Sequence, residues 1–512
     1  MIKRNYRIIL FLLFLPLYVG AKTINPLDYG LREAKTGEER FWVLYRTHEL
    51  AHQKHLKVSY KGIEQIALDI PEDAKSIPLS DKTDFCNCRL VVTNTERKNF
   101  YLFVLSQQLQ PIDVTKDKID NGDFRTHPAL CDGHKLLVIV DENPWVENRT
   151  GYDYGVKRKD ILYLRHGCSV NKTISPYNNS YSQPKCSYVS VSNKQKLFQN
   201  ISFIRTGHSS EKTFLLKVYN QNNVRIDGIQ IITPEPITLT GDIAILLENC
   251  VNATLTNIRI DGTYSSHSKF GYGIALDNVW NSYISNIESN AAWGVFGNHN
   301  VNTVHMNNSS VNRFDAHCYA RDFTFTDCEF SLVGLNQSSF MGDLIFEHCV
   351  FNHASVCESR YDYNAYTSFT ISIKNCTILL DEYHHSVVKL SEVPQNRNTR
   401  YELKEKYAPN INISRSKIVL DDAMSFFSLY LLGSNQNKKP IDHWGSVSVD
   451  SIVVEGKEQK MMVVNRMIET NDNVNINIKG IEFTDFTLNM SELDDNEMKN
   501  KSRVIMNLKT QR

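Results

Sequence analysis

The tetrapeptides Leu255-Thr256-Asn257-Ile258 and Ile284-Ser285-Asn286-Ile287 are two copies of a unit that recurs from about residue 195 onward. Each copy has an apolar residue, a polar residue, an Asn, Asp or Gly, and then an apolar residue or Cys. Intervals of roughly 20 to 30 residues between such units are typical of a parallel β-helix with one coil per repeat. Stacked coils bury their apolar side chains in a column, and Asn, Asp and Gly tolerate the left-handed backbone at tight corners. We therefore predict an all-β fold, a right-handed parallel β-helix solenoid with an N-terminal cap region.

The flanking segments lack this regular period. Residues 1–21 combine basic residues, a short apolar run and small residues ending at Ala21, which is typical of a signal peptide. A membrane anchor is the competing interpretation, but the run is too short to span a bilayer comfortably. We predict a cap and early irregular coils over residues 22–190, with a helix-compatible stretch at residues 33–52. We predict the parallel β-helix with the active groove over residues 191–490 and a charged tail over residues 491–512. The mature protein is expected to be exported and to be periplasmic, cell-surface or secreted.

Charge and cysteine content exclude some classes of partner. Lys and Arg together number 57, as do Asp and Glu, so there is no global basic field to attract nucleic acid. An anionic ligand would need a local cluster of Arg and His. The chain has 11 Cys, and three of them, Cys328, Cys349 and Cys376, occupy one register of the repeat. We expect these three to stack inside as small hydrophobes rather than to form disulfides or a metal site.

The pentapeptide Arg313-Phe314-Asp315-Ala316-His317 carries the strongest candidate for chemistry. In a β-strand, alternate side chains point to opposite faces, so Phe314 and Ala316 can face a core while the other three project together. This arrangement places a cation, a carboxylate and an imidazole in one row. A solvated strand face or an ion-pair ladder is the alternative interpretation.

Stacking of coils extends this row. Asn298 precedes His317 by about one coil, and Glu358, Arg360 and Asp362 follow about two coils further on, so all of them could line one groove. Tyr361 and Tyr363 fall on the other face of a regular strand, although a bulge could turn one of them outward.

The segments at residues 293–298, 313–317 and 360–363 resemble three successive motifs of pectate-lyase-like β-helix proteins, a group of secreted and prophage tail-associated polysaccharide-degrading proteins. The resemblance covers about residues 270 to 380, and the rest of the chain is similar only as a general β-helix. It implies a groove that acts on a polysaccharide. The sequence departs from the family pattern at residues 318–321, where a Gly-containing turn is expected, and at residues 364–365.

Two chemistries fit these residues. In β-elimination from a uronate-containing polysaccharide, Asn298, Arg313 or Arg360 would neutralise the carboxylate, and His317 would act as the base. Hydrolysis would instead use Asp315 with Asp362 or Glu358 as a carboxyl pair. A non-catalytic glycan-binding β-helix is the third possibility. We favour a lyase acting on an anionic polysaccharide, with glycosaminoglycans such as chondroitin sulfate ahead of pectin-like polymers.

The candidate site residues fall into two groups. We assign catalytic roles to His317, Arg313, Asp315, Arg360 and Tyr363, and substrate-binding roles to Asn298, Trp293, His299, Glu358, Tyr361 and Asp362. No metal ligand and no cofactor are assigned, and a divalent cation such as calcium is left open. No membrane span is expected in the mature chain, and the sequence leaves the oligomeric state open.

Overall fold

The computed structural model describes most of the chain between residues 23 and 510. The described residues are 23–93, 100–146, 156–173, 184–206, 213–233, 242–262, 271–289, 293–360, 368–390, 407–422, 424, 426–432, 443, 445–456, 460–465, 476–484 and 504–510. The predicted signal peptide at residues 1–21 therefore lies outside the described residues, and so do Tyr361, Asp362 and Tyr363. Among the described residues, no helix is long and apolar enough to cross a membrane.

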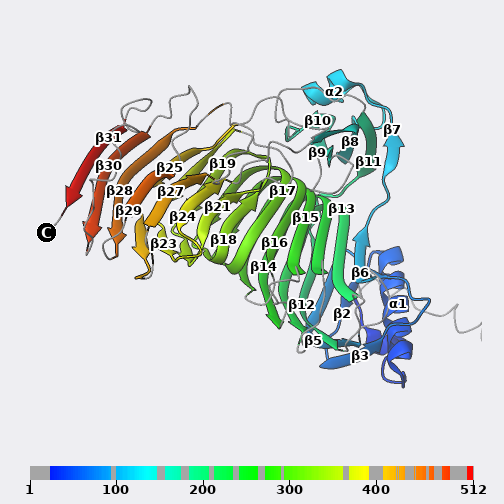
Figure 1. Ribbon diagram of the computed structural model, residues 1–512. Coiled ribbons are helices and arrows are strands. Elements are labelled where there is room, and N and C mark those ends of the chain that lie inside the picture. The colour runs from blue at the N-terminus through cyan, green and yellow to red at the C-terminus, as the bar shows by residue number, and fades with distance from the viewer. Residues whose placement is uncertain are drawn as a thin grey trace, which may run out of the picture.

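The body of the protein is a right-handed parallel β-helix, as predicted (Figure 1). Its strands are β1 Thr23–Ile24, β2 Lys57–Ser59, β3 Gln65–Asp69, β4 Ile77–Pro78, β5 Lys82–Thr93, β6 Phe100–Ser106, β12 Lys196–Thr206, β13 Thr213–Thr233, β14 Asp242–Gly262, β15 Gly271–Ser289, β16 Gly294–Asn307, β17 Ser310–Thr326, β18 Glu329–Gln337, β19 Phe340–Glu347, β20 Val350–Asn352, β21 Ser355–Ser359, β22 Phe369–Lys374, β23 Thr377–Leu380, β24 Ser386–Leu390, β25 Asn410–Ser414, β26 Lys417–Leu420, β27 Phe426–Leu432, β28 Val447–Glu455, β29 Lys460–Asn465, β30 Ile476–Thr484 and β31 Val504–Thr510.

The parallel ladder extends beyond the predicted range of 191–490 at both ends. Strand β5 pairs in parallel with β12, and β31 pairs in parallel with β30, so the segment that we expected to be a charged tail contains a strand. Strand β5 contains a copy of the repeat, Phe85-Cys86-Asn87-Cys88, in which Asn87 has positive φ.

The N-terminal end is covered by helix α1 (Gly37–Lys54), which follows the short helix η1 (Pro26–Tyr29). A capping box starts α1, because the Thr36 side chain accepts a hydrogen bond from Glu39 N and the Glu39 carboxylate accepts one from Thr36 N. Phe41, Leu44 and Ala51 are fully buried against the first coil. The predicted cap helix is therefore present, and it begins at Gly37, four residues after the start of the predicted stretch.

Residues 107–146, 156–173 and 184–193 form a separate unit that the sequence did not reveal. Strands β7 (Gln110–Ile112), β8 (His134–Val146), β9 (Val156–Arg165), β10 (Cys168–Ser169) and β11 (Pro184–Ser190) make an antiparallel sheet, with helix α2 (Lys116–Asn121) beside it. We call this unit the insertion. It projects from the side of the β-helix near β13 and β15 (Figure 1). Ile161 and Tyr163 of β9 pack in one apolar cluster with Val251 and Trp280 of the β-helix, so the insertion is docked on it.

Asparagine corners shape the central coils. Asn249 and Asn278 have positive φ, which Asn tolerates better than most residues. Their side chains form a ladder in which Asn278 Nδ2 donates to Asn249 Oδ1 over 2.8 Å and Asn249 Nδ2 donates to Asn220 Oδ1 over 3.1 Å. At the next corner, Asn286 Nδ2 donates to Asn257 Oδ1 over 3.0 Å. The corner role predicted for Asn is confirmed.

The predicted cysteine stack is also confirmed. Cys328, Cys349 and Cys376 are buried in the main core cluster, and none of them is in a disulfide. Within the ranges that the structure describes, no group of three His, Cys, Asp or Glu side chains is arranged to hold a metal ion.

Candidate active site on the outer face of the β-helix

The row predicted from alternation lies on strand β17. Phe314 and Ala316 point into the core and are fully buried, and Arg313, Asp315 and His317 project from the opposite face. Parallel pairing aligns Asp315 with Phe296 on one side and with Asn336 on the other. Asn336 pairs in turn with Glu358, and Glu358 with Lys389. Glu358 therefore lies two strands from Asp315, as the repeat length predicted.

Asp315 is held in a buried hydrogen-bonded cluster. Its Oδ2 accepts hydrogen bonds from Arg313 Nε over 3.0 Å, from Arg313 Nη2 over 2.7 Å and from the Tyr272 hydroxyl over 2.5 Å. The side chain of Asp315 is fully buried, and that of Arg313 is 12% exposed. Burial raises the pKa of Asp315, although the Arg313 guanidinium opposes that shift. Burial and the Asp315 charge raise the pKa of Tyr272 well above its ordinary value.

Asp315 contacts Arg313 and Tyr272 rather than His317. Its Oδ2 is engaged by Arg313 and Tyr272, and its Oδ1 has no hydrogen-bond partner among the described residues. A carboxylate on this strand could hold either the imidazole or a neighbouring Arg, and the structure has it on the Arg. Arg313 was a candidate to bind a substrate carboxylate, yet its guanidinium is already paired with Asp315. Residues that alternate on one strand share a face, but register and rotamers decide which of them touch.

Trp293 lies beneath the same guanidinium. Arg313 Cζ is 3.8 Å from the centroid of the Trp293 ring, a cation–π arrangement. The adjacent Gly294 allows β16 to approach β17 closely, because a Cβ atom there would lie 2.0 Å from the carbonyl oxygen of Arg313. Trp293 was a candidate for stacking on sugar, and in the structure one face of its ring is occupied by Arg313.

His317 lies on the outer face between an aromatic ring and a guanidinium. Phe296 packs edge to face against the imidazole, with ring centroids 4.5 Å apart. Arg360 Nη1 lies 2.9 Å from His317 Nε2. Because a guanidinium can only donate, Nε2 must be the acceptor and therefore the unprotonated nitrogen. The sequence predicted that His317 and Arg360 line one groove, and the structure shows that their side chains are in contact.

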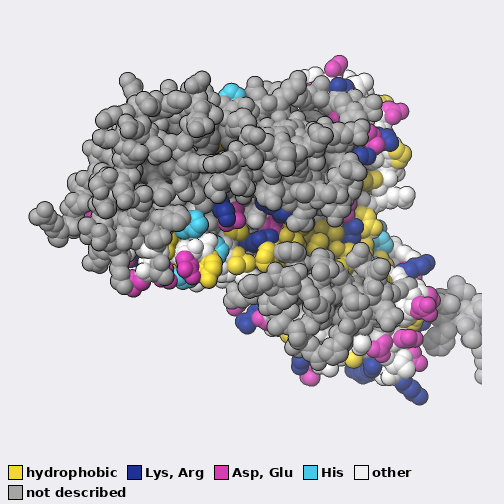
Figure 2. Space-filling view, in the orientation of Figure 1, with side chains coloured by type: hydrophobic (Ala, Val, Ile, Leu, Met, Phe, Trp, Pro, Cys, Tyr) yellow, Lys and Arg dark blue, Asp and Glu magenta, His cyan; other side chains and the backbone are white. Residues whose placement is uncertain are grey.

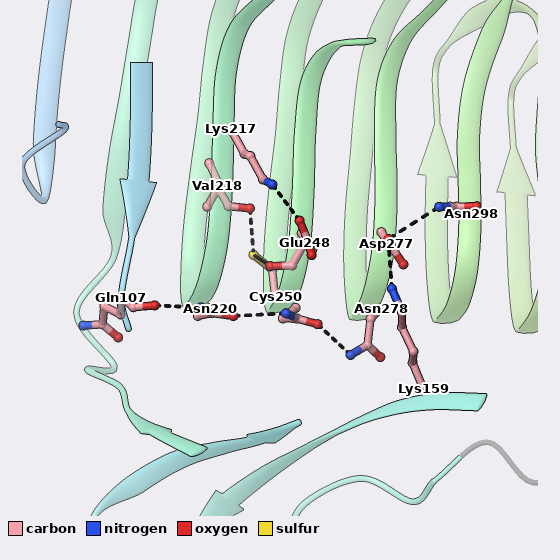
Figure 3. Close-up of polar contacts among 11 residues, drawn as sticks. Gln107, Lys159, Lys217, Val218, Asn220, Glu248, Cys250, Asp277, Asn278 and Asn298 are labelled. Atoms are coloured by element: carbon pink, nitrogen blue, oxygen red, sulfur yellow. Dashed lines mark hydrogen bonds and ion pairs between the residues drawn. The ribbon is translucent and has the colours of Figure 1, made fainter. Parts of the chain in front are cut away.

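Asn298 precedes His317 on the neighbouring strand and belongs to a polar group at the edge of the insertion (Figure 3). Asn298 Nδ2 donates to Asp277 Oδ2 over 3.4 Å, and Lys159 Nζ from the insertion lies 3.5 Å from the same oxygen. Further along the outer face, Lys217 and Glu248 form an ion pair of 2.8 Å.

Several of these groups were missed at the level of sequence. Lys159 was missed because the insertion has no repeat register that could align it with the coils. Tyr272 was missed because it lies 43 residues before Asp315 in the chain.

Of the remaining candidates, His299 is partly buried and neutral, and three others lie outside the described residues. His299 pairs in register with Cys318, and burial lowers its pKa to about 4. Nearby Lys159 adds to that lowering and Asp277 opposes it. A neutral imidazole in this position gives no charge for an anionic ligand. The predicted roles of Tyr361, Asp362 and Tyr363 fall on residues outside the described ranges.

Comparison with known proteins identifies the fold. No family model and no curated protein sequence matches the chain. Among solved structures it is similar to the tailspike gp49 of Pseudomonas phage LKA1, with 13% identity and a TM-score of 0.50 over 91% of this chain and 81% of that one. It is similar to the tailspike gp61 of Pseudomonas phage phi297, with 12% identity and a TM-score of 0.51 over 90% of this chain and 80% of that one. It is also similar to the gp54 tailspike of Acinetobacter baumannii bacteriophage AP22, solved in complex with a capsular saccharide, with 9% identity and a TM-score of 0.56 over 94% of this chain and 79% of that one. At these identities the likeness shows a shared β-helix fold.

Proposed function

We propose that the protein is an exported lyase that cleaves a uronate-containing polysaccharide by β-elimination on the outer face around β17. The observation that carries this proposal is the contact between His317 Nε2 and Arg360 Nη1, with Asn298 on the neighbouring strand. An imidazole with an unprotonated nitrogen beside a guanidinium suits removal of a proton next to a carboxylate. Glycosaminoglycans such as chondroitin sulfate remain our favoured substrates within this class.

The proposed reaction gives each of these groups a role, and His317 acts twice. Arg360 and Asn298 bind the uronate carboxylate, which makes the proton on C5 more acidic. As the carboxylate draws Arg360 away, His317 Nε2 takes this proton. The C5–H electron pair forms the C4–C5 double bond, and the C4–O bond breaks toward the leaving sugar oxygen. His317, now an imidazolium, returns its proton to that oxygen. Arg313 stays paired with Asp315, so Arg360 replaces it as the carboxylate ligand.

Two alternatives rest on specific observations. Asp315 and Glu358 are two strand spacings apart, about 9.6 Å between backbones. The carboxyl groups of inverting glycosidases are about 6.5–9.5 Å apart. The raised pKa of Asp315 would suit a general acid, but its complete burial argues against direct contact with a substrate. The AP22 tailspike complex supports a glycan as the partner and an extracellular location, and it is equally compatible with binding alone.

The test is to incubate the full-length mature chain with glycosaminoglycans, pectins, alginate and capsular polysaccharides. Elimination gives an unsaturated product that absorbs in the ultraviolet, whereas hydrolysis gives only new reducing ends. We expect His317→Gln to lower turnover by about 100-fold or more with unchanged circular dichroism. Lys417→Gln is the matched control, because Lys417 forms an ion pair with Glu455 on another face of the β-helix.

The outcomes separate the proposals. New reducing ends without ultraviolet absorbance would favour hydrolysis, and binding without any cleavage would favour a glycan-binding protein. Because Arg360 and Asn298 neutralise the carboxylate in our proposal, activity should survive removal of calcium by EDTA. A complete loss that added calcium restores would contradict this division of roles.

A further inference from the structure

A row of polar side chains crosses the outer face from His317 toward the insertion. Asn298 on β16 lies beside His317 on β17, because the residues on either side of each are paired in register. Leu276 pairs with Gly297, which in the same way puts Asp277 on β15 beside Asn298. Asn298 Nδ2 donates to Asp277 Oδ2 over 3.4 Å, so the side chains of these two residues are in contact. The row therefore leads from the proposed base to a carboxylate two strands away.

The insertion places a lysine at the end of this row. Lys159 Nζ lies 3.5 Å from Asp277 Oδ2, the oxygen that also accepts from Asn298 (Figure 3). Because both nitrogen atoms lie near this one oxygen, the ammonium group is no more than about 7 Å from the Asn298 amide. Lys159 is thus less than two strand spacings from a proposed ligand of the reacting uronate.

Lys159 is accessible, unlike the residues around it on β9. From Arg158 to Leu164, every other residue of this strand is buried. The Lys159 side chain is 33% exposed. Arg158 and Asp160 form their own buried ion pair of 2.8 Å, and Ile161 packs in the apolar cluster that docks the insertion. Docking therefore has other contacts, and the Lys159 ammonium group is left at the surface.

The contact with Asp277 leaves much of the hydrogen-bonding capacity of Lys159 unused. An ammonium group has three donors, and among the described residues Asp277 is the one side chain that forms a hydrogen bond or ion pair with it. Their separation of 3.5 Å is long for such a contact, whereas Lys217 and Glu248 on the same face lie 2.8 Å apart. Lys159 can therefore accept a further anionic oxygen as a partner.

The surrounding charges favour an anion at this position. Asp277 and Glu248 each face a lysine, and Arg360 adds a cation beside His317. Hydrophobic side chains gather in the hollow over β13 to β15, and charged side chains lie beside them toward the C-terminal strands (Figure 2). One strand spacing of about 4.8 Å is close to the length of one sugar residue. A polysaccharide that lies along the β-helix axis with a uronate at His317 therefore brings an adjacent sugar to Lys159.

We infer that Lys159 is a specificity-determining residue that binds an anionic group on the sugar next to the reacting uronate. This inference rests on the proposed function and specifies the substrate class of the same site. A sulfate and a second uronate carboxylate offer the ammonium group the same chemistry, an anionic oxygen that accepts a charge-assisted hydrogen bond. The substrate would then carry negative charge on two successive sugars.

The experiment measures binding by isothermal titration calorimetry with the His317→Gln chain, which should bind without cleaving. The sugar next to the uronate is uncharged in chondroitin, sulfated in chondroitin sulfate, and a second uronate in polygalacturonate. We expect Lys159→Gln, introduced into this chain, to weaken binding of at least one of the last two polymers by about three- to tenfold. Binding of chondroitin should change by less than about twofold. The polymer that loses affinity identifies the anionic group as sulfate or carboxylate.

Two further variants separate recognition from a structural effect. Lys157→Gln is the matched control, because it removes the same charge from the same strand, and Lys157 pairs with Glu142 inside the insertion. It should leave all three affinities unchanged. Lys159→Arg keeps a cation that donates to anions, so its affinities should stay within about twofold of those of the parent chain. Circular dichroism checks that each variant is folded.

An equal loss for all three polymers on Lys159→Gln would show that Lys159 supports the fold rather than recognition, and would overturn the inference while leaving the proposed function in place. Unchanged affinities would also overturn it, as would an equal effect of Lys157→Gln or a loss in Lys159→Arg as large as in Lys159→Gln. Failure of the parent chain to bind any of the three polymers would overturn the proposed function and this inference together.

Discussion

Replacing Asp315 with Asn removes the charge that compensates a nearly buried guanidinium. Arg313 Nε and Nη2 both donate to Asp315 Oδ2, at 3.0 and 2.7 Å, and only 12% of the Arg313 side chain is exposed. Breaking a buried ion pair by removing one partner typically costs about 3–5 kcal/mol. We expect a loss of this size from the free energy of unfolding of Asp315→Asn at neutral pH. The Tyr272 hydroxyl can still donate to the Asn oxygen, so its contribution should be largely retained.

A second substitution tests the cause of that loss. Replacing Arg313 with Met in the Asp315→Asn chain removes the uncompensated charge and leaves an apolar side chain over Trp293. Replacing a buried ion pair by apolar groups is often neutral, so the double variant should recover about 2 kcal/mol or more. Urea unfolding followed by tryptophan fluorescence measures all three variants. If Asp315→Asn lies within about 1 kcal/mol of the parent chain, or if the double variant is no more stable than Asp315→Asn, the cluster does not work as described.

Two further predictions concern stability. Asn249→Ala should lower the free energy of unfolding by about 2–5 kcal/mol, because it breaks two corner hydrogen bonds and puts Ala in the left-handed region. Asn249→Gly should lose only the hydrogen bonds, so equal losses in the two urea titrations would contradict the backbone argument. Burial lowers the pKa of His48 to about 3, so below its ordinary value of 6.5 the unfolded chain takes up a proton that the folded chain does not. Stability should therefore fall by about 1.4 kcal/mol per pH unit from this group as the pH drops from 6.5 toward 3. A His48→Gln chain with the same acid slope, measured between pH 4 and 7, would show that another group is responsible.

The sequence predicted those features that follow from a repeated register. Corner asparagines, the cysteine stack and the two-strand separation of Asp315 and Glu358 all depend on coil length, which the recurring unit reveals. Register alone does not determine which side chains of Arg313, Asp315 and His317 form hydrogen bonds with one another. Arg313 and Asp315 are two residues apart on one strand, and the same spacing joins Arg225 to Asp227 on β13 and Arg259 to Asp261 on β14. Alternation along the strand predicts which side chains share a face, but it does not predict which of them form a hydrogen bond.

The insertion marks the other limit of sequence reasoning. Residues 136–140 are an apolar run typical of a strand, but their antiparallel partners come from segments with no common period. Docking of this sheet depends on a few apolar side chains such as Ile161 and Trp280, which look like ordinary core residues in the sequence. Lys159 could be placed beside Asp277 only once that docking was known.

The corner asparagines also constrain how such a chain can change in length. Asn220, Asn249 and Asn278 succeed one another at intervals of 29 residues, and the same interval separates Asn257 from Asn286. Gain or loss of one whole coil would give each corner amide a new partner of the same kind, whereas an extra residue within a strand would move the corners of that coil out of register. Such a protein can therefore grow or shrink in whole turns, each of which moves strands β16 to β21 by about 4.8 Å relative to the capped end. The distance between the capped end and the candidate site thus becomes a property that duplication of a single turn can adjust, without any change to the residues of that site.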